Sequence, residues 1–121
     1  MFDFEQLSVY KKIRSLNKKL LPGLLSVETR RPYLVDQLKR ASLSVSLNLA
    51  EGIGRESPAD RKQFLIRARA STFECVSILH VFEDIGYWSD SKCSDLCSEY
   101  EEISKMLWSM IRNLNARMNS K

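Results

Sequence analysis

The feature that most constrains the fold is a long run of apolar residues spaced three or four positions apart in the second half of the chain. Ser57 and Pro58 open it as a helix N-cap and first-turn proline, and Gly86 closes it. Its apolar face consists of Phe64, Ala68, Ser71, Cys75, Ile78, Phe82 and Ile85, with Leu65, Thr72 and Leu79 alongside. This spacing predicts a helix over residues 58–85, roughly 42 Å long.

A second stripe of the same kind follows Gly86 and predicts another long helix, over residues 90–118. Its members are Leu96, Tyr100, Ile103, Leu107, Ile111 (or Met110), Leu114 and Met118. The spacing is close to a heptad repeat, in which two positions in every seven face a partner helix. The second half of the chain is therefore expected to form two long helices joined by a turn.

The first half carries two shorter stripes, which predict helices over residues 4–21 and 33–52. Asp3 is a favourable N-cap for the first helix, and Pro22 and Gly23 are expected to end it, leaving a loop over 24–32. Its apolar face consists of Val9, Ile13, Leu16 and Leu20. The face of the second helix consists of Leu34, Leu38, Ala41, Val45 and Leu49, interleaved with Ser42, Ser44, Ser46 and Ala50. These small residues predict close packing on more than one side.

These four helices predict an all-α fold, an antiparallel up-down-up-down four-helix bundle in a single domain over residues 1–121. A chain of 121 residues with 44% hydrophobic residues is of the usual size and composition for one globular domain. Short connections at 54–57 and 86–89 make neighbouring helices antiparallel. The second connection between helices, the end of the last helix and the start of the first should then share one pole of the bundle.

Composition argues against secretion and membrane insertion. No apolar run approaches the roughly 18 residues that a transmembrane helix needs. The opening residues MFDFEQ lack the basic and apolar regions of a secretory signal. Cys75, Cys93 and Cys97 cannot pair completely, so we expect reduced thiols and a cytoplasmic location.

Charge is unevenly distributed along the chain, whose formal net charge is +4. Residues 1–72 carry 14 Lys and Arg against 7 Asp and Glu, a balance of +7. Residues 73–102 carry 8 acids against one lysine, a balance of −7, and residues 103–121 carry 4 bases and no acid. Segregated basic charge suits an anionic partner such as nucleic acid, although an excess of this size is also common in proteins that bind none.

The stretch NLAEGIGRES, residues 48–57, superficially resembles a phosphate-binding loop. It follows a helix, and it lacks the third glycine and the lysine that nucleotide-binding loops require. Gly52 and Gly54 are therefore expected to serve as a helix exit with positive φ angles. Only the start of the next helix, with Arg55, Arg61 and Lys62 nearby, remains a candidate for contact with a nucleic-acid phosphate.

Two surfaces are candidates for nucleic-acid binding. The shared pole gathers basic residues that acids at Asp3, Glu5, Glu56 and Asp60 partly offset; they are Arg55, Arg61, Lys62, Arg112, Arg117 and Lys121. A second strip on the first helix contains Lys11, Lys12, Lys18 and Lys19. Either surface is equally consistent with a solvated outer face.

No pattern predicts a catalytic, metal or cofactor site. Glu51 and Glu74 are expected to lie about five or six helical turns apart, too far to share a proton. The single histidine, His80, belongs to no Glu-x-x-His motif, and the three cysteines do not form a zinc set. Tyr87 and Trp88 could stack on bases, but aromatic residues at a bundle turn are more often part of a core or interface.

Polar residues near the packed faces of the second and third helices are expected to be structural and to define the interface. They are Arg40, Asn48, Glu51, Ser71 and Glu74. Glu74 should pair with Arg40 or Lys39 across the two helices, because a buried charge requires a partner. Glu51 should pair with a base near the loop or on a neighbouring protomer.

Several segments together resemble the four-helix-bundle family of 23S ribosomal RNA intervening-sequence proteins. They are Gln37-Leu38-Lys39-Arg40-Ala41, Asn48-Leu49-Ala50-Glu51-Gly52, Phe64-Leu65 with Ala68, Ala70, Ser71 and Glu74, and Ile103-Ser104-Lys105-Met106-Leu107. The resemblance extends from residue 4 to about residue 115. Ala70 stands where the family usually has glycine, and the connection between the first two helices looks several residues longer than usual.

The resemblance implies a homopentameric ring without established enzymatic activity. It also implies kinship with accessory proteins of diversity-generating retroelements, which engage RNA and a reverse transcriptase. We therefore expect a non-enzymatic, oligomeric protein that binds nucleic acid, RNA in preference to a specific DNA sequence. The alternative is a protein-interaction scaffold that recruits a partner such as a reverse transcriptase without binding nucleic acid itself.

Overall fold

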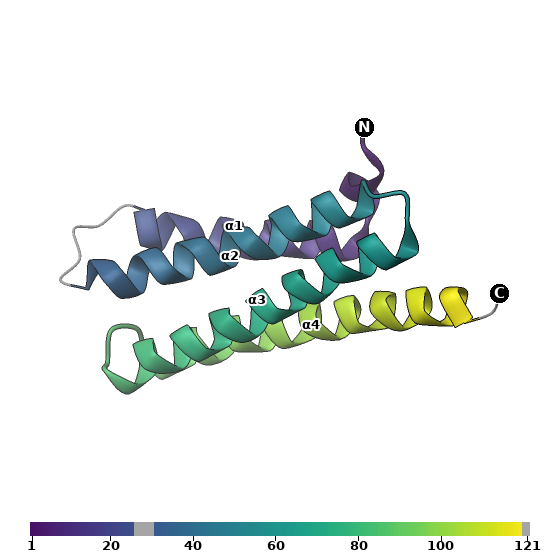
Figure 1. The fold of residues 1–121 in the computed structure, drawn as a ribbon. Coiled ribbons are helices and arrows are strands. Elements are labelled where there is room, and N and C mark those ends of the chain that lie inside the picture. The colour runs from purple at the N-terminus through teal and green to yellow at the C-terminus, as the bar shows by residue number, and fades with distance from the viewer. Residues whose placement is uncertain (26–30, 120–121) are drawn as a thin grey trace.

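The computed structural model describes residues 1–25 and 31–119, and within them the chain is all-α, as predicted. A short 3-10 helix, η1, precedes four α-helices that form an up-down-up-down bundle (Figure 1). Their bounds are η1 Asp3–Gln6, α1 Ser8–Leu25, α2 Pro32–Ile53, α3 Pro58–Asp84 and α4 Asp90–Asn119. Each helix packs against its neighbours in sequence, and α1 closes the bundle by packing against α4. The N-terminus, the α2–α3 connection and the C-terminal end of α4 lie at the same pole (Figure 1).

Both predicted ends of the first helix were wrong. Asp3 lies inside η1 rather than at an N-cap, and α1 begins only at Ser8. At the other end α1 continues through Pro22 to Leu25. Pro22 is exposed, so the hydrogen bond that it cannot donate is lost at the surface, while the continuing turn buries Leu24 in the core. Of the predicted loop over 24–32, residues 26–30 lie outside the described part of the chain.

The core follows the predicted stripes closely. All four residues predicted for the apolar face of α1 are buried, and so are the residues predicted for the apolar face of α4 from Leu96 to Leu114. Two core predictions at helix ends were wrong. Ile85 is 42% exposed because α3 ends at Asp84. Val35, which was not predicted to be in the core, is buried. Of the small residues of α2 that were predicted to allow close packing, Ser42 is fully buried, while Ser44, Ser46 and Ala50 are half-buried.

The α2–α3 turn does not use its glycines as predicted. Among the residues described, only Gly86 has a positive φ, and Gly54 is in the right-handed helical region at φ −76°. Gly52 lies inside α2, where a Cβ atom would stand 2.7 Å from Cβ of Phe64 on α3. Its role is therefore close helix approach rather than an unusual backbone angle.

Both ends of α3 are capped by hydrogen bonds. The Ser57 hydroxyl accepts a hydrogen bond from the Asp60 amide at 3.3 Å, the N-cap contact predicted for α3. At the other end the Gly86 amide donates to the Glu83 carbonyl and the Tyr87 amide donates to the Phe82 carbonyl. This pair of bonds is a Schellman motif, and the Tyr87 ring packs edge-on against Phe82 at 4.9 Å.

Candidate nucleic-acid interface

The shared pole contains a hollow of about 360 Å³ between η1, the end of α2, the start of α3 and the end of α4. We call it the pole hollow. Its rim carries Asp3, Arg61, Asn113 and Arg117, and its floor is apolar, formed by Leu7, Ile53, Leu65, Met110 and Leu114. The expected meeting of Arg61 and Arg117 with Asp3 at this pole is thus what the structure shows.

Arg55, the other arginine of the turn, is engaged within its own chain. Its guanidinium pairs with Glu51 at 2.8 Å and lies 4.8 Å from the centre of the Phe64 ring. Its carbonyl oxygen accepts a hydrogen bond from Nε of Arg61 at 2.5 Å. The expected partner for Glu51, a base near the loop, is therefore Arg55, and Arg55 is less available to a phosphate than its position in the sequence suggested.

The remaining basic residues of the pole lie outside the hollow. Lys62 lines a groove between α3 and α4, and Arg112 is exposed on α4. Neither forms an ion pair within residues 1–25 and 31–119. Lys121 lies outside the described residues.

The basic strip of α1 divides into two halves with different surroundings. Lys12 pairs with Glu102 and Lys19 pairs with Glu99, both at 2.9 Å, so these two lysines form ion pairs between α1 and α4. Lys11, Arg14 and Lys18 all lack an acidic partner in the described chain. Spacings of three and four residues place Lys11, Arg14 and Lys18 on one exposed helix face. We call these three residues the α1 stripe.

The α1 stripe was only partly predicted from the sequence. Lys11 and Lys18 were expected on a basic strip, whereas Arg14 was missed. Its spacing from Lys11 and Lys18 was the signal that could have found it. Which lysines are neutralised by α4 could not be read from the spacing, because that depends on how the two helices are rotated against each other.

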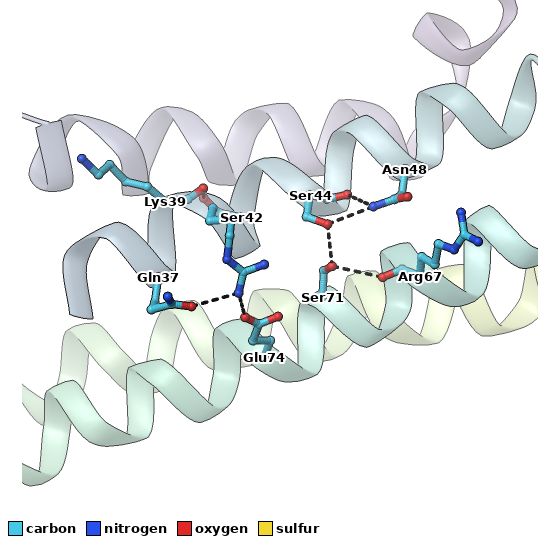
Figure 2. Close-up of polar contacts among 9 residues, drawn as sticks. Gln37, Lys39, Ser42, Ser44, Asn48, Arg67, Ser71 and Glu74 are labelled. Atoms are coloured by element: carbon cyan, nitrogen blue, oxygen red, sulfur yellow. Dashed lines mark hydrogen bonds and ion pairs between the residues drawn. The ribbon is translucent and has the colours of Figure 1, made fainter. Parts of the chain in front are cut away.

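A row of polar contacts joins the facing sides of α2 and α3 (Figure 2). Arg40 pairs with Glu74, as predicted, and its guanidinium also donates to the side-chain oxygen of Gln37 at 3.0 Å. The pair is partly exposed, so its contribution to stability is small and its role is to align the two helices. Its predicted part in joining protomers stays a prediction.

The same row continues toward the pole through hydroxyl and amide groups (Figure 2). The Ser44 hydroxyl oxygen accepts hydrogen bonds from the Asn48 side-chain amide at 2.9 Å and from the Ser71 hydroxyl at 2.8 Å. Asn48 also donates to the Ser44 carbonyl at 2.9 Å. These groups satisfy one another's hydrogen bonds between α2 and α3.

Side chains that commonly ligate metals are dispersed in the described residues. In the part of the chain that the structure describes, no three His, Cys, Asp or Glu side chains come together. Tyr87 and Trp88 pack edge-on against Phe82, at 4.9 and 5.0 Å between ring centres, and both are half-buried. They belong to an aromatic cluster at the α3–α4 turn that packs against the hydrophobic core, as aromatic residues at a bundle turn usually do.

Cys75 on α3 and Tyr100 on α4 are both buried in the core. Burial raises the pKa of the Cys75 thiol from 9.0 to about 12, and it also raises the pKa of Tyr100. Burial likewise raises the pKa values of Cys93 and Cys97. All three cysteines are free thiols.

The free energy of unfolding is expected to fall as pH rises from 9 toward 12, because the unfolded chain releases the Cys75 proton there while the folded chain retains it. The slope that Cys75 adds approaches about 1.4 kcal/mol per pH unit. Urea unfolding of the wild type and of Cys75→Ala, repeated across this range, measures it. Identical pH slopes in the two proteins would contradict the assignment.

No helix within the described residues is long and apolar enough to cross a membrane. A search of curated proteins found no match to the chain. Among solved structures, the chain is similar to a protein of unknown function from the S23 ribosomal protein family of Bacteroides thetaiotaomicron VPI-5482. The identity is 20%, the TM-score is 0.77, and the alignment covers 85% of this chain and 97% of the other. This likeness supports the bundle fold.

A family model settles the relationship that the motifs in α2, α3 and α4 indicated. The model describes the 23S rRNA-intervening sequence protein and matches residues 5–109, from η1 through most of α4. The matched range includes the polar row between α2 and α3 as well as the α1 stripe. The chain belongs to the 23S rRNA-intervening sequence protein family.

Proposed function

We propose that this protein is a non-enzymatic, self-associating helical bundle that binds nucleic acid, RNA in preference to DNA, in the cytoplasm. The observation that carries the proposal is the α1 stripe, three cations on one exposed helix face without an acidic partner in the described chain. The three free thiols support a reducing, cytoplasmic location.

Phosphate contacts supply most of the binding in this proposal. Lysine and arginine side chains at helical spacing match a charged backbone, and they release condensed counterions when they bind it. Reading of base edges in a groove is not expected, because no helix within the described residues presents Asn, Gln and Arg together at a free N-terminal face. Structured RNA is therefore recognised mainly by the placement of its phosphates.

Self-association is supported by two exposed apolar surfaces, one on α2 and the other between α3 and α4. The first, the α2 patch, consists of Leu43 and Leu47, of which Leu47 is 65% exposed. The second, the α3–α4 groove, contains Ile66, Phe73 and Trp108, with Phe73 54% exposed. Exposed apolar patches of this kind mark protein interfaces.

The α3–α4 groove also holds an unsatisfied donor. The Arg69 guanidinium lies 4.8 Å from the Phe73 ring centre and 5.0 Å from that of Trp108. Its Nε is buried and has no acceptor within the described residues. A second copy that placed its α2 patch in the groove would cover both rings and bring polar groups near this donor.

Contact between two different surfaces is head-to-tail, and a head-to-tail contact closes into a ring or continues as a filament. We favour the ring of five copies that the family resemblance implies. A ring repeats the α1 stripe around its circumference, so modest charge on one protomer becomes a large combined surface.

Leu47→Glu is expected to convert the oligomer into a monomer, because it places a charge in the apolar contact. Leu25→Glu is the matched control, since Leu25 is similarly exposed at 67% but lies on α1. Native mass by light scattering checks the expectation. A wild-type mass of 14.0 kDa would contradict self-association, and equal masses for the two variants would contradict the α2 patch as its site.

The alternative function is a scaffold that recruits a protein such as a reverse transcriptase. The exposed Phe73 and Trp108 support it, because large aromatic residues are enriched where proteins bind one another. It would be favoured over nucleic-acid binding if the wild type bound no RNA.

Titration of the wild-type protein with a structured RNA and a DNA duplex of equal length tests the main proposal. Log affinity should fall linearly with log salt concentration between about 50 and 200 mM, with the RNA bound more tightly at each point. If the protein bound neither nucleic acid at the lowest salt concentration, the proposal would be contradicted. Equal affinity for both nucleic acids would remove the preference for RNA.

A further inference from the structure

The pole hollow combines cationic, acidic, amide and apolar groups in one concave site. Its volume of about 360 Å³ lies within the range of about 300–1,000 Å³ typical of small-molecule pockets. Most of its floor is apolar, while four polar side chains converge on its rim. A concave apolar floor with a few convergent polar groups is the usual form of a ligand site.

The two arginines provide the anion-binding part of this site. Arg61 projects from the first turn of α3 and Arg117 from the last turn of α4. Nε of Arg61 is held by the Arg55 carbonyl at 2.5 Å, which fixes the direction of its guanidinium. The terminal nitrogens of Arg61 have no acceptor among the described residues, so they remain available to a phosphate.

The other two rim residues indicate a nucleotide rather than a bare anion. A carboxylate at Asp3 opposes an inorganic anion, but it can accept hydrogen bonds from the hydroxyl groups of a ribose. The Asn113 amide can both donate to and accept from a base edge. The floor, with Leu65 and Leu114 buried at its base, offers apolar contact to the face of the base.

We propose that the pole hollow binds a phosphorylated ribonucleotide, with phosphate at Arg61 and Arg117, ribose near Asp3 and base on the apolar floor. The same chemistry is present in a free nucleoside monophosphate and in the phosphorylated end of an RNA strand. In the second case the inference rests on the proposed function and adds recognition of a strand end to phosphate contacts along α1.

The experiment uses the wild-type assembly and four probes: adenosine monophosphate, and one short single-stranded RNA with a 5′-phosphate, with a 3′-phosphate, or with hydroxyl groups at both ends. At least one phosphorylated end should bind about tenfold more tightly than the hydroxyl form, by fluorescence anisotropy at fixed salt. Arg61→Gln should abolish that preference. Arg112→Gln, at the same pole but outside the hollow, should preserve it.

Two further variants separate recognition from damage to the fold. Asn113→Asp places a negative charge on the exposed rim without touching the core, and it should weaken the phosphorylated probes alone. With deoxyadenosine monophosphate added as a fifth probe, Asp3→Ala should reduce the preference for adenosine monophosphate over its deoxy form. Thermal unfolding of each variant verifies that the bundle is intact.

The outcomes distinguish this inference from the proposed function. RNA binding with equal affinity for all strand ends, and without binding of adenosine monophosphate, overturns the pole hollow as a nucleotide site and leaves the α1 stripe unaffected. Binding of adenosine monophosphate without any binding of RNA supports the hollow and overturns the proposed function. An end preference that Arg61→Gln leaves unchanged also overturns the inference.

Discussion

Replacing Gly52 by alanine is expected to destabilise the bundle by about 1–3 kcal/mol. The new Cβ would stand 2.7 Å from Cβ of Phe64 and 3.4 Å from the Arg61 carbonyl oxygen. Rotation of the Phe64 ring cannot relieve this contact, because Cβ is attached directly to the backbone of α3. The two helices would have to separate at the pole, beside the connection that carries Arg55 and the first turn of α3 that carries Arg61.

The sign of this change makes it informative. Glycine inside a helix is normally less stable than alanine by about 0.5–1 kcal/mol, so an uncrowded site would gain stability. Gly54→Ala is the matched control, since Gly54 has a helical backbone and its nearest contacts are carbonyl oxygens at 3.4 and 3.8 Å. Urea denaturation should show a large loss for Gly52→Ala and little change for Gly54→Ala. A gain in stability for Gly52→Ala would contradict the close approach of α2 and α3.

The double substitution of Lys11 and Lys18 by glutamine is expected to weaken RNA binding by at least about tenfold at low salt. Both lysines belong to the α1 stripe and have no acidic partner in the described chain. Each lost phosphate contact should also lower the slope of log affinity against log salt concentration by about 1. The measurement is a salt titration of RNA affinity by anisotropy or filter binding.

Lys12 and Lys19 provide a control matched in residue type, spacing, helix and net charge. They pair with Glu102 and Glu99, so their positive charge is already neutralised by α4. Substituting both by glutamine should change RNA affinity and the salt slope much less. Equal losses from the two double variants would mean that net charge alone governs binding, and the α1 stripe would have no special role.

Local sequence patterns predicted the helices well wherever side-chain spacing and capping agreed. The start of α3 at Pro58 and the turn at Gly86 follow from the chemistry of single residues, so both could be predicted. The end of α1 could not, because burial of Leu24 favours the helix against the local effect of Pro22. The prediction of a positive φ at Gly52 was wrong for a similar reason. Glycine is needed there because Phe64 on α3 lies too close for a Cβ atom, and the neighbouring residues in the sequence do not indicate this contact.

The candidate site was predictable at the level of topology but not of individual contacts. An up-down-up-down bundle necessarily brings Arg61 and Arg117 to one pole, and the structure places both on the rim of the pole hollow. The engagement of Arg55 by Glu51 and Phe64 depends on side-chain geometry at the turn. The pairing of Lys12 and Lys19 with α4, which leaves Lys11, Arg14 and Lys18 as the unpaired face, depends on how α1 is rotated against α4.

The mass of the protein–RNA complex in solution tests the central claim most directly. At low salt concentration the protein is expected to elute with structured RNA at a mass several times 14.0 kDa, with one RNA bound to an assembly of several copies. Raising the salt concentration should release the RNA while the assembly persists, since apolar contacts hold the copies together and charge holds the RNA. A 14.0 kDa protein eluting apart from free RNA would contradict both self-association and nucleic-acid binding.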